Sequence, residues 1–239
     1  MEWILVSKYV GAGLAIGIAA FGSAFGEGLI AFKASESIAR QPKASSEIVR
    51  TMLITQAIAE TSGIFGLLVS VILLFVISKE GTTAFAFGNI AAGFCIGVGA
   101  IGAGIGSGQA GGAACESIGR HPRLSPNILI TTLVGQAVVQ TGCIFAMVVS
   151  MFLVLTKQSS DNIAVIGSVL GAGICMGLGA IGSDNGTGIV AKKAIWGMSR
   201  DSRNMGMMTR TMLLGQAVSI TTAIYSLIIA FLLILTGEG

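Results

Sequence analysis

A single glutamate, Glu60, lies near the middle of an apolar run that extends from Met52 to Ile77. A run of roughly 20 mostly apolar residues is long enough to cross a bilayer as a helix. A carboxylate in such a helix costs on the order of 2.5–3.5 kcal/mol on insertion scales. Because one substitution would remove that cost, Glu60 indicates a functional site whose chemistry is the binding of a proton or a cation.

Two hydroxyl side chains, Thr61 and Ser62, follow this carboxylate directly. A hard cation such as sodium needs several oxygen ligands and one compensating negative charge. A proton needs only the carboxylate and a nearly dry environment. The hydroxyl pair is more than a proton requires, so the sequence favours sodium, with the proton as the alternative. A threonine hydroxyl also bonds readily to its own helix, so Thr61 alone does not identify an ion site.

The composition predicts an integral membrane protein. Of the 239 residues, 53% are hydrophobic and 10% are charged, and the mean hydropathy is +0.87. An average soluble domain is about 25% charged. The first apolar run, from Tyr9, is a full span rather than a short signal segment, so we do not expect secretory cleavage. The cysteines lack metal-ligand spacing and lie in or beside apolar runs, which predicts packing residues at Cys95, Cys115, Cys143 and Cys175.

An 80-residue repeat without gaps accounts for the whole chain. The copies align Gln56 with Gln136 and Gln216, and Thr61 with Thr141 and Thr221. The glycines at positions 13, 17, 22, 26 and 28 recur in both later copies. We therefore expect three units, at residues 1–80, 81–160 and 161–239.

Each unit contains two apolar runs. The first runs, at about 9–38, 86–118 and 163–198, are rich in glycine, whereas the second, at about 50–78, 128–156 and 208–236, are rich in Leu, Ile, Val and Phe. In lipid only helices and closed barrels satisfy the backbone, and runs of this length fit helices. We predict an all-α membrane protein with six transmembrane helices in three tandem hairpins. The small-residue spacing of the first helices predicts that they pack closely in a circle.

Basic residues gather in the loops within the hairpins. These are Arg40, Lys43 and Arg50, then Arg120, His121 and Arg123, and then Arg200, Arg203 and Arg210. The loops between hairpins contain Lys79 and Glu80, then Lys157 and Asp161. The positive-inside rule therefore predicts cytoplasmic loops within the hairpins and both termini outside.

The carboxylate is not repeated. Its position reads Glu60, Gln140 and Ile220 in the three units. Glutamine cannot exchange a proton or balance a cation, and isoleucine has no ligand atom, so we expect units two and three to be ion-silent at this position.

A position on the first helices follows the same pattern, reading Glu27, Ser107 and Thr187. If Glu27 and Glu60 faced one site, both could not remain ionised cheaply, and one would stay protonated or share a proton. Asp184 has no counterpart in the other units, so it either faces a polar interior or supplements a site.

The stretches Gly22–Gly28, Ala31–Pro42 and Gln56–Gly63 resemble the rotor-ring c subunit (proteolipid) of rotary ATP synthases. In that family a glycine-rich inner helix leads through an Arg-Gln-Pro loop into an outer helix with one ion-binding carboxylate. The resemblance covers the chain three times. The Arg-Gln-Pro loop is similar to F-type subunits, whereas fusion of several hairpins is more familiar in V- and A-type rings.

The resemblance implies a set of ion ligands. Carried over from sodium-binding members, they are Glu60, Thr61, the carbonyl of Ile58 and, through water, Ser62, with Glu27 at the place of an inner-helix glutamine. Phe65 stands where the family has a tyrosine that supports the carboxylate. Because a family site draws ligands from adjacent hairpins, the possible neighbouring contributors are Ser107, Thr187 and Gln140.

The resemblance also implies partners and a mechanism. Other c subunits would complete a ring in the lipid bilayer of a bacterial plasma membrane, next to a stator a subunit. The central-stalk subunits gamma and epsilon would contact the loop residues Arg40, Gln41, Pro42, Arg120 and Arg200. The ring would carry Na⁺, or H⁺, on Glu60 and couple its movement to ATP synthesis or hydrolysis, without catalysing bond chemistry, without a cofactor and without binding nucleic acid.

One carboxylate per six helices implies fewer ions per turn than one per hairpin. We therefore expect either a machine biased toward ATP-driven pumping or a ring that also contains single-hairpin subunits. Two readings of another class are a secondary ion-coupled transporter and a structural membrane scaffold. Transporter repeats typically contain broken helices, and no proline lies inside the spans predicted here.

Overall fold

Six helical spans in three hairpins form the molecule. The computed structural model describes residues 2–76, 81–156 and 162–237, and six helices in these ranges are long and apolar enough to cross a membrane. Hairpin 1 contains α1 (Glu2–Arg40) and α2 (Ser45–Phe75), hairpin 2 contains α3 (Thr83–Arg120), α4 (Ser125–Val139) and α5 (Thr141–Leu155), and hairpin 3 contains α6 (Ile163–Arg200) and α7 (Met205–Gly237). The predicted all-α fold of six spans is confirmed.

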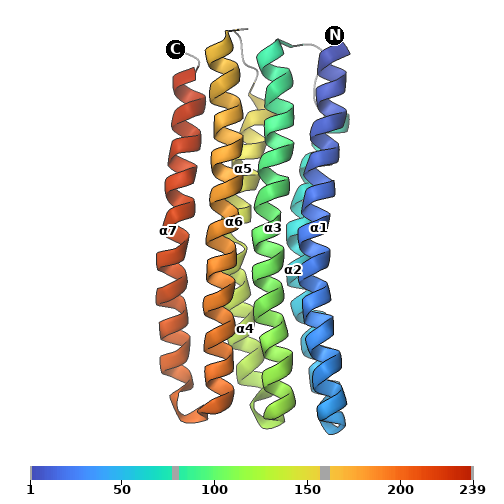
Figure 1. The fold of residues 1–239 in the computed structure, drawn as a ribbon, viewed down its shortest axis with the longest axis vertical. Helices are drawn as coiled ribbons and strands as arrows, with labels where there is room; N and C mark the ends of the chain where they lie inside the picture. Colours follow the sequence, from blue (N-terminus) through green and yellow to red (C-terminus); the bar gives the residue numbers. More distant parts are fainter. Residues whose placement is uncertain (1, 77–80, 157–161, 238–239) are drawn as a thin grey trace.

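The hairpins turn through short 3-10 helices at Pro42–Ala44, Pro122–Leu124 and Ser202–Asn204. Proline suits the first position of such a turn because its φ is already fixed and the missing N–H has no partner there. The third turn has no proline, and there the Asp201 side chain accepts a hydrogen bond from the backbone N–H of Arg203 at 3.1 Å. All three turns lie at one end of the molecule, and the start of α1 and end of α7 lie at the other (Figure 1). The charged residues of the loops between hairpins, at positions 79, 80, 157 and 161, lie outside the described residues.

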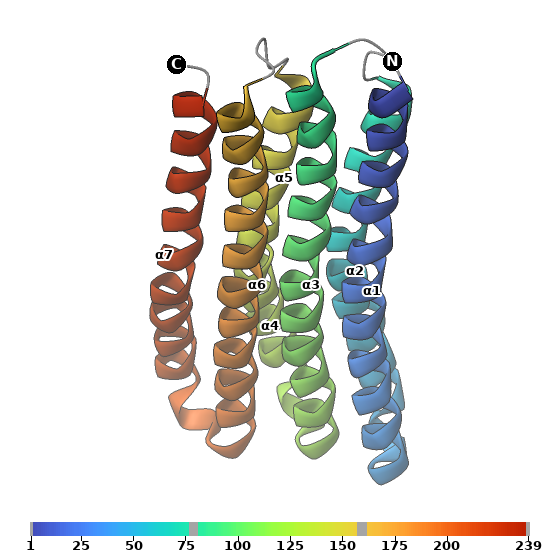
Figure 2. The ribbon, with the colours of Figure 1, turned by 45° about the horizontal axis from the view of Figure 1, so that its top comes forward.

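The glycine-rich helices α1, α3 and α6 stand side by side, with α3 in the middle (Figures 1 and 2). Helix α2 and the α4–α5 pair pack behind them, and α7 packs on α6. In the most apolar stretch of α3, 78% of the residues are buried inside the chain, against 17% for the span that contains α7. The middle hairpin is thus enclosed, while the outer flanks of hairpins 1 and 3 are open.

Backbone-to-backbone contact explains the glycines of these helices. A Cβ added to Gly26 would lie 2.0 Å from the carbonyl oxygen of Gly104, and one added to Gly188 would lie 2.3 Å from the Cα of Gly106. No side chain fits at such distances, so only glycine allows α1, α3 and α6 to approach this closely. The predicted close packing of the first helices is confirmed between hairpins 1 and 2 and between hairpins 2 and 3.

The helices differ from the predicted runs in two respects. Most extend beyond the apolar residues, as α1 does by beginning at Glu2, because an apolar run marks the hydrocarbon layer and not the end of hydrogen bonding. The run predicted at 128–156 is also divided at Gln140, between α4 and α5. The backbone bond from Ile144 N–H to the Gln140 carbonyl, at 3.0 Å, still joins the two pieces. The four cysteines are free. Cys95, Cys115 and Cys143 are buried, as predicted for packing residues, and Cys175 is half-buried.

Candidate functional site

Glu60 and Glu27 face one hollow between α1 and α2. The hollow has a volume of about 270 Å³ and is lined by Ile16, Ala20, Ser23, Ala24, Glu27, Glu60, Gly63, Ile64 and Leu67. Glu60 is exposed on the open flank of hairpin 1, and no hydrogen bond reaches its carboxylate from the described residues. The structure therefore brings together the two carboxylates that the sequence could only consider as companions.

Hydrogen bonds within hairpin 1 hold Glu27 in place. Its Oε1 accepts a bond from the Ser23 hydroxyl at 2.9 Å, and its backbone carbonyl accepts one from Gln56 Nε2 at 3.1 Å. The remaining lining is almost entirely apolar. The hollow therefore places two carboxyl groups and one hydroxyl in otherwise apolar surroundings, a set of oxygen atoms suited to a cation or a proton.

The carbonyl of Ile58 belongs to a different flank of α2. Two residues along a helix are separated by about 200° of rotation, so Ile58 and Glu60 point in nearly opposite directions. The Ile58 carbonyl accepts bonds from Thr61 Oγ1 at 2.6 Å and from Gln140 Nε2, in hairpin 2, at 3.0 Å. Ser62 is buried and donates to the Ala59 carbonyl at 3.0 Å. The assignment of Ile58, Thr61 and Ser62 as ligands beside Glu60 stays a prediction. Within one chain, the Ile58 carbonyl bonds hairpin 2, and Thr61 and Ser62 donate to carbonyls of α2.

Gln140 occupies the interface between hairpins 1 and 2. Besides its bond to Ile58, its Nε2 donates to the Ser107 hydroxyl at 3.0 Å. The outer-helix position thus contacts the inner helix of its own hairpin and a carbonyl of the preceding hairpin. Ser107 therefore joins Gln140 and not Glu60, while Thr187, in hairpin 3, donates to the Asp184 carbonyl at 2.8 Å.

A second bond repeats with the same register at both internal interfaces. Gln136 Nε2 donates to the Thr55 carbonyl of the preceding hairpin at 3.1 Å, and Gln216 Nε2 donates to the Gly135 carbonyl at 3.0 Å. Gln56 makes only its bond within hairpin 1 among the described residues. The flank of α2 that presents Gln56 and Glu60 is therefore the one that would face a preceding hairpin, which one chain does not contain.

Asp184 lies between hairpins 2 and 3, where the sequence did not place it. Its side chain is fully buried, its Oδ1 accepts a bond from the Gly142 N–H at 2.9 Å, and its Oδ2 has no hydrogen-bond partner among the described residues. Gly142 is the second residue of α5, so the carboxylate satisfies one of the free N–H groups at a helix start. Asp184 thus binds the point at which the outer helix of hairpin 2 is interrupted.

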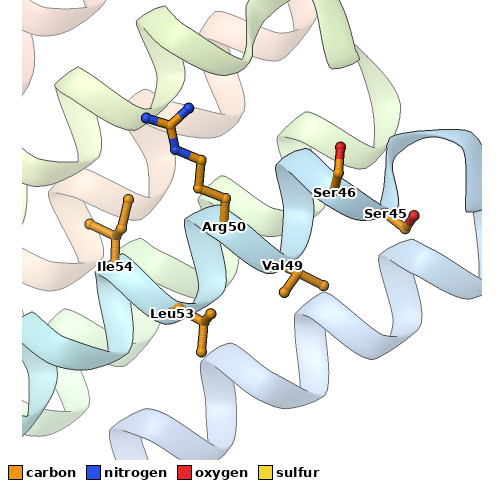
Figure 3. A pocket seen from close by; sticks show the side chains of 6 residues that line it. All are labelled: Ser45, Ser46, Val49, Arg50, Leu53 and Ile54. Carbon is orange, nitrogen blue, oxygen red and sulfur yellow. The ribbon is translucent and has the colours of Figure 1, made fainter.

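The predicted stalk-contact residues lie at the turn end. Arg40 pairs with Glu36 at 2.5 Å, Arg120 pairs with Glu116, and Arg200 is the last residue of α6. Gln41 donates its N–H to the Ser37 carbonyl at 2.9 Å and precedes Pro42. A groove of about 580 Å³ lies nearby on the first turns of α2 (Figure 3), lined by Ser45, Ser46, Val49, Arg50, Leu53 and Ile54. It contains no carboxylate, so it is not a counterpart of the Glu60 hollow.

Tyr225 is a candidate residue that the sequence motifs did not reveal. The position five residues after Glu60 reads Phe65, Phe145 and Tyr225 in the three hairpins. Both phenylalanines pack against the core, but Tyr225 is 64% exposed on the open flank of hairpin 3. The 80-residue repeat could have identified Tyr225, because it aligns this residue of the third hairpin with Phe65 of the first.

Comparison with known proteins gives three matches to one family model. The model, which describes the C subunit of ATP synthase, matches residues 10–73, 90–153 and 170–233. A-type ATP synthase subunit K of Methanocaldococcus jannaschii is 30% identical over 234 residues, covering 97% of both chains.

Shorter relatives match part of the chain. The ATP synthase c subunit of Alkaliphilus oremlandii is 50% identical over 74 residues, or 31% of this chain and 83% of the relative. The ATP synthase c subunit of Thermotoga petrophila is 46% identical over 76 residues, or 32% of this chain and 89% of the relative.

Proposed function

This chain belongs to the family of ATP synthase c subunits, as a fusion of three copies, and from that membership we propose that it transports sodium ions on Glu60. As a member it is a non-catalytic, ion-translocating, multi-pass membrane protein of the rotor ring of a rotary ATP synthase or ATPase, where it assembles with other c-type hairpins. The observation that supports the ion site is the pair of carboxylates, Glu27 and Glu60, on one hollow.

Sodium fits this pair because it supplies positive charge between two groups that repel each other when ionised. The carboxylate oxygens and the Ser23 hydroxyl, which already bonds Glu27, are the hard oxygen donors that such a cation prefers. A proton shared by the two carboxyl groups is the second candidate, and the same pairing favours it.

Hairpin 3 of a second copy would complete the site. The internal interface joins the Gln140 side chain to the Ile58 carbonyl, whose other partner is Thr61. In hairpin 3, Thr221 Oγ1 donates to the Val218 carbonyl at 2.6 Å, the same arrangement on an open flank. Shifted by the repeat, this flank would bring the Val218 carbonyl, Thr221 and Tyr225 to Glu60 of the next copy. The phenol would then stand at the one interface that has a carboxylate at the position of Glu60.

Open glycines on α1 support a ring made of copies of this chain. A Cβ added to Gly13, Gly17 or Gly28 would meet nothing within 4 Å. At the equivalent positions of α3, added Cβ atoms would lie 2.0 Å from Gly11, 2.6 Å from Leu14 and 2.6 Å from Gly26, all on the preceding inner helix. The missing neighbour of α1 is therefore an inner helix of the same kind, such as α6 of another copy.

In this ring, Glu60 would take an ion from one half-channel of a stator a subunit, travel through the lipid as the ring turns, and release it to a second half-channel. The turns that contain Arg40, Gln41, Pro42, Arg120 and Arg200 would contact the gamma and epsilon subunits of the central stalk. The basic turns would lie in the cytoplasm of a bacterial cell, with both termini on the other side of the plasma membrane.

One site per six helices lowers the number of ions moved per turn for a ring of given size. Each ATP hydrolysed then moves fewer ions and can sustain a steeper gradient, whereas synthesis needs a larger driving force. We therefore propose that the machine favours ATP-driven pumping, provided that the ring contains only this chain.

Labelling of the purified ring with a carbodiimide that modifies protonated carboxyl groups tests the proposal. We expect labelling at Glu60 above neutral pH to be slowed by sodium but not by choline. Glu60→Gln should abolish ion-coupled ATPase activity in a ring that still assembles, whereas Glu47→Gln, a change in the first turn of α2, should leave it unchanged. Labelling that ignores sodium would favour the proton, and coupling that survives Glu60→Gln would refute the role of Glu60.

A further inference from the structure

The interface between hairpins 1 and 2 has the polar groups of an ion site around Gln140, but an amide stands at the position of the carboxylate. We propose that it is a dormant sodium site, held closed by the amide of Gln140, which the single substitution Gln140→Glu would open. This inference rests on the proposed function, because it takes the Glu60 position as the one that binds the ion.

The amide nitrogen of Gln140 occupies the place of a cation. It lies 3.0 Å from the Ile58 carbonyl oxygen and 3.0 Å from the Ser107 hydroxyl oxygen, and it donates a hydrogen bond to each. A third oxygen, Thr61 Oγ1, lies 2.6 Å from the same Ile58 carbonyl. The N–H groups therefore supply the positive partner for a cluster of oxygen atoms, and they do so from a neutral side chain that cannot leave.

The other half of the amide is unused. Gln140 is 6% exposed, and its Oε1 is buried without a hydrogen-bond partner among the described residues. Buried polar atoms are rarely left unpaired, but the Oε1 atoms of Gln136 and Gln216 are unpaired as well, so this oxygen does not by itself distinguish Gln140. Replacing the nitrogen by a carboxylate oxygen would turn an acceptor toward the Ile58 carbonyl, which is also an acceptor, while the Ser107 hydroxyl could rotate to donate to it. A positive ion or a proton between the carboxylate and the carbonyl would stabilise that arrangement.

The interface between hairpins 2 and 3 lacks these features. Ile220 has no polar side-chain atom, and Asp184 fills the space beside Gly142. The dormant site is therefore specific to Gln140 and does not follow from the repeat alone.

The experiment places Gln140→Glu in a Glu60→Gln ring, so that the native ion position is silent. We expect carbodiimide to label residue 140, as located by mass spectrometry of the labelled peptide. Sodium at about ten times its Kd should slow this labelling about tenfold, because only the unoccupied fraction reacts. Adding Ser107→Ala should weaken the sodium protection.

Val134→Glu in the same Glu60→Gln ring is the matched control. Val134 is exposed on the same outer helix, so a carboxylate there should be labelled without protection by sodium. Absence of labelling at residue 140, or labelling that sodium does not slow, would overturn the dormant site. Parallel labelling of Glu60 in the unmodified ring tests the proposed function separately.

Assembly provides a second readout. If the Gln140→Glu ring is recovered from membranes in sodium but not in choline, the dependence on sodium supports the inference. If it assembles in neither salt, the oxygen cluster does not accept a cation, and the inference is wrong.

Discussion

At the scale of single residues, three side chains at equivalent positions create three different interfaces. Glu60 lies exposed beside Glu27, Gln140 donates to two oxygen atoms, and Ile220 has no polar side-chain atom. A carboxylate on an open flank remains free to exchange an ion, whereas an amide enclosed by two hairpins is a permanent hydrogen-bond donor. In the proposed function, ion transport would therefore be restricted to hairpin 1 by the identity of the side chain at this one position.

Tyr225 offers a prediction at this scale. We expect Tyr225→Phe to weaken sodium protection of Glu60 against carbodiimide by about tenfold or more, because a hydrogen bond to a charged group contributes about 1.5–3 kcal/mol. The measurement is the sodium concentration that halves the labelling rate in the assembled ring.

Phe65→Tyr is the control for this prediction. It adds a hydroxyl at the interface of hairpins 1 and 2, where Gln140 replaces the carboxylate. It should therefore leave the sodium protection of Glu60 unchanged. An equal sodium concentration for Tyr225→Phe and the unmodified ring would remove Tyr225 from the site.

At the scale of elements, the outer helix of hairpin 2 is interrupted where an inner helix inserts a carboxylate. A Cβ added to Gly142 would lie 2.4 Å from Asp184 Oδ1, so Gly142 leaves the space that Asp184 fills. The equivalent pair in the preceding interface is Ser62 with Gly104, in which the larger residue is on the outer helix. By the repeat register, the larger residue of the pair is on the inner helix at one interface and on the outer helix at the other. The first turn of α5 therefore donates an N–H to a carboxylate of α6.

This exchange predicts coupling between Gly142 and Asp184. Gly142→Ser should destabilise the ring by about 1–3 kcal/mol, because the added atoms overlap the carboxylate. Asp184→Gly should also destabilise it, through a cavity and a lost hydrogen bond. The double variant re-creates the Ser62–Gly104 pair and should recover stability relative to the sum of the two changes, with a coupling of about 0.5–3 kcal/mol.

Thermal disassembly of the purified ring, measured for the unmodified chain, both single variants and the double variant, gives this coupling. Strictly additive effects would mean that the two side chains do not share one space.

At the scale of the whole molecule, the chain is an arc with two unequal open flanks. Hairpin 1 presents a carboxylate pair and open glycines, and hairpin 3 presents Thr221 and Tyr225. The internal interfaces repeat one hydrogen bond, from Gln136 to the Thr55 carbonyl and from Gln216 to the Gly135 carbonyl. On the open flank of hairpin 1, the equivalent donor Gln56 bonds only within its own hairpin among the described residues. In the proposed ring, the two open flanks of the arc would meet those of further copies, as a closed ring requires.

Gly28 provides the test of ring closure. Its counterpart Gly188 leaves only 2.3 Å between an added Cβ and Gly106, so we expect Gly28→Leu to block the contact with the next copy and to leave chains that do not close into a ring. Native mass spectrometry of the detergent-solubilised complex measures the number of chains.

Gly206→Ser is the matched control, because Gly206 also has open space and its counterparts are Ser46 and Pro126. This variant should form a ring of normal size. A normal ring with Gly28→Leu would show that α1 does not contact another inner helix there.

Much of the fold was predictable because it depends on local and periodic features. Apolar length identified the spans, the glycine spacing identified the helices that approach closely, and the repeat divided the chain into hairpins; the structure confirms the spans and the close approach. The break at Gln140 could not be predicted in this way, because the Asp184 carboxylate that bonds Gly142 beside it is 42 residues further along the sequence.

The sequence by itself determined that Glu60 is the single carboxylate at its repeated position, and that two equivalents had become Gln140 and Ile220. Only the tertiary structure decided the neighbours. It placed Glu27 and Glu60 on one hollow and brought the Ile58 carbonyl, to which Thr61 donates, into contact with Gln140. The reason is physical: residue identity fixes which atoms are available, but helix rotation and the order of hairpins around the arc fix which of those atoms meet.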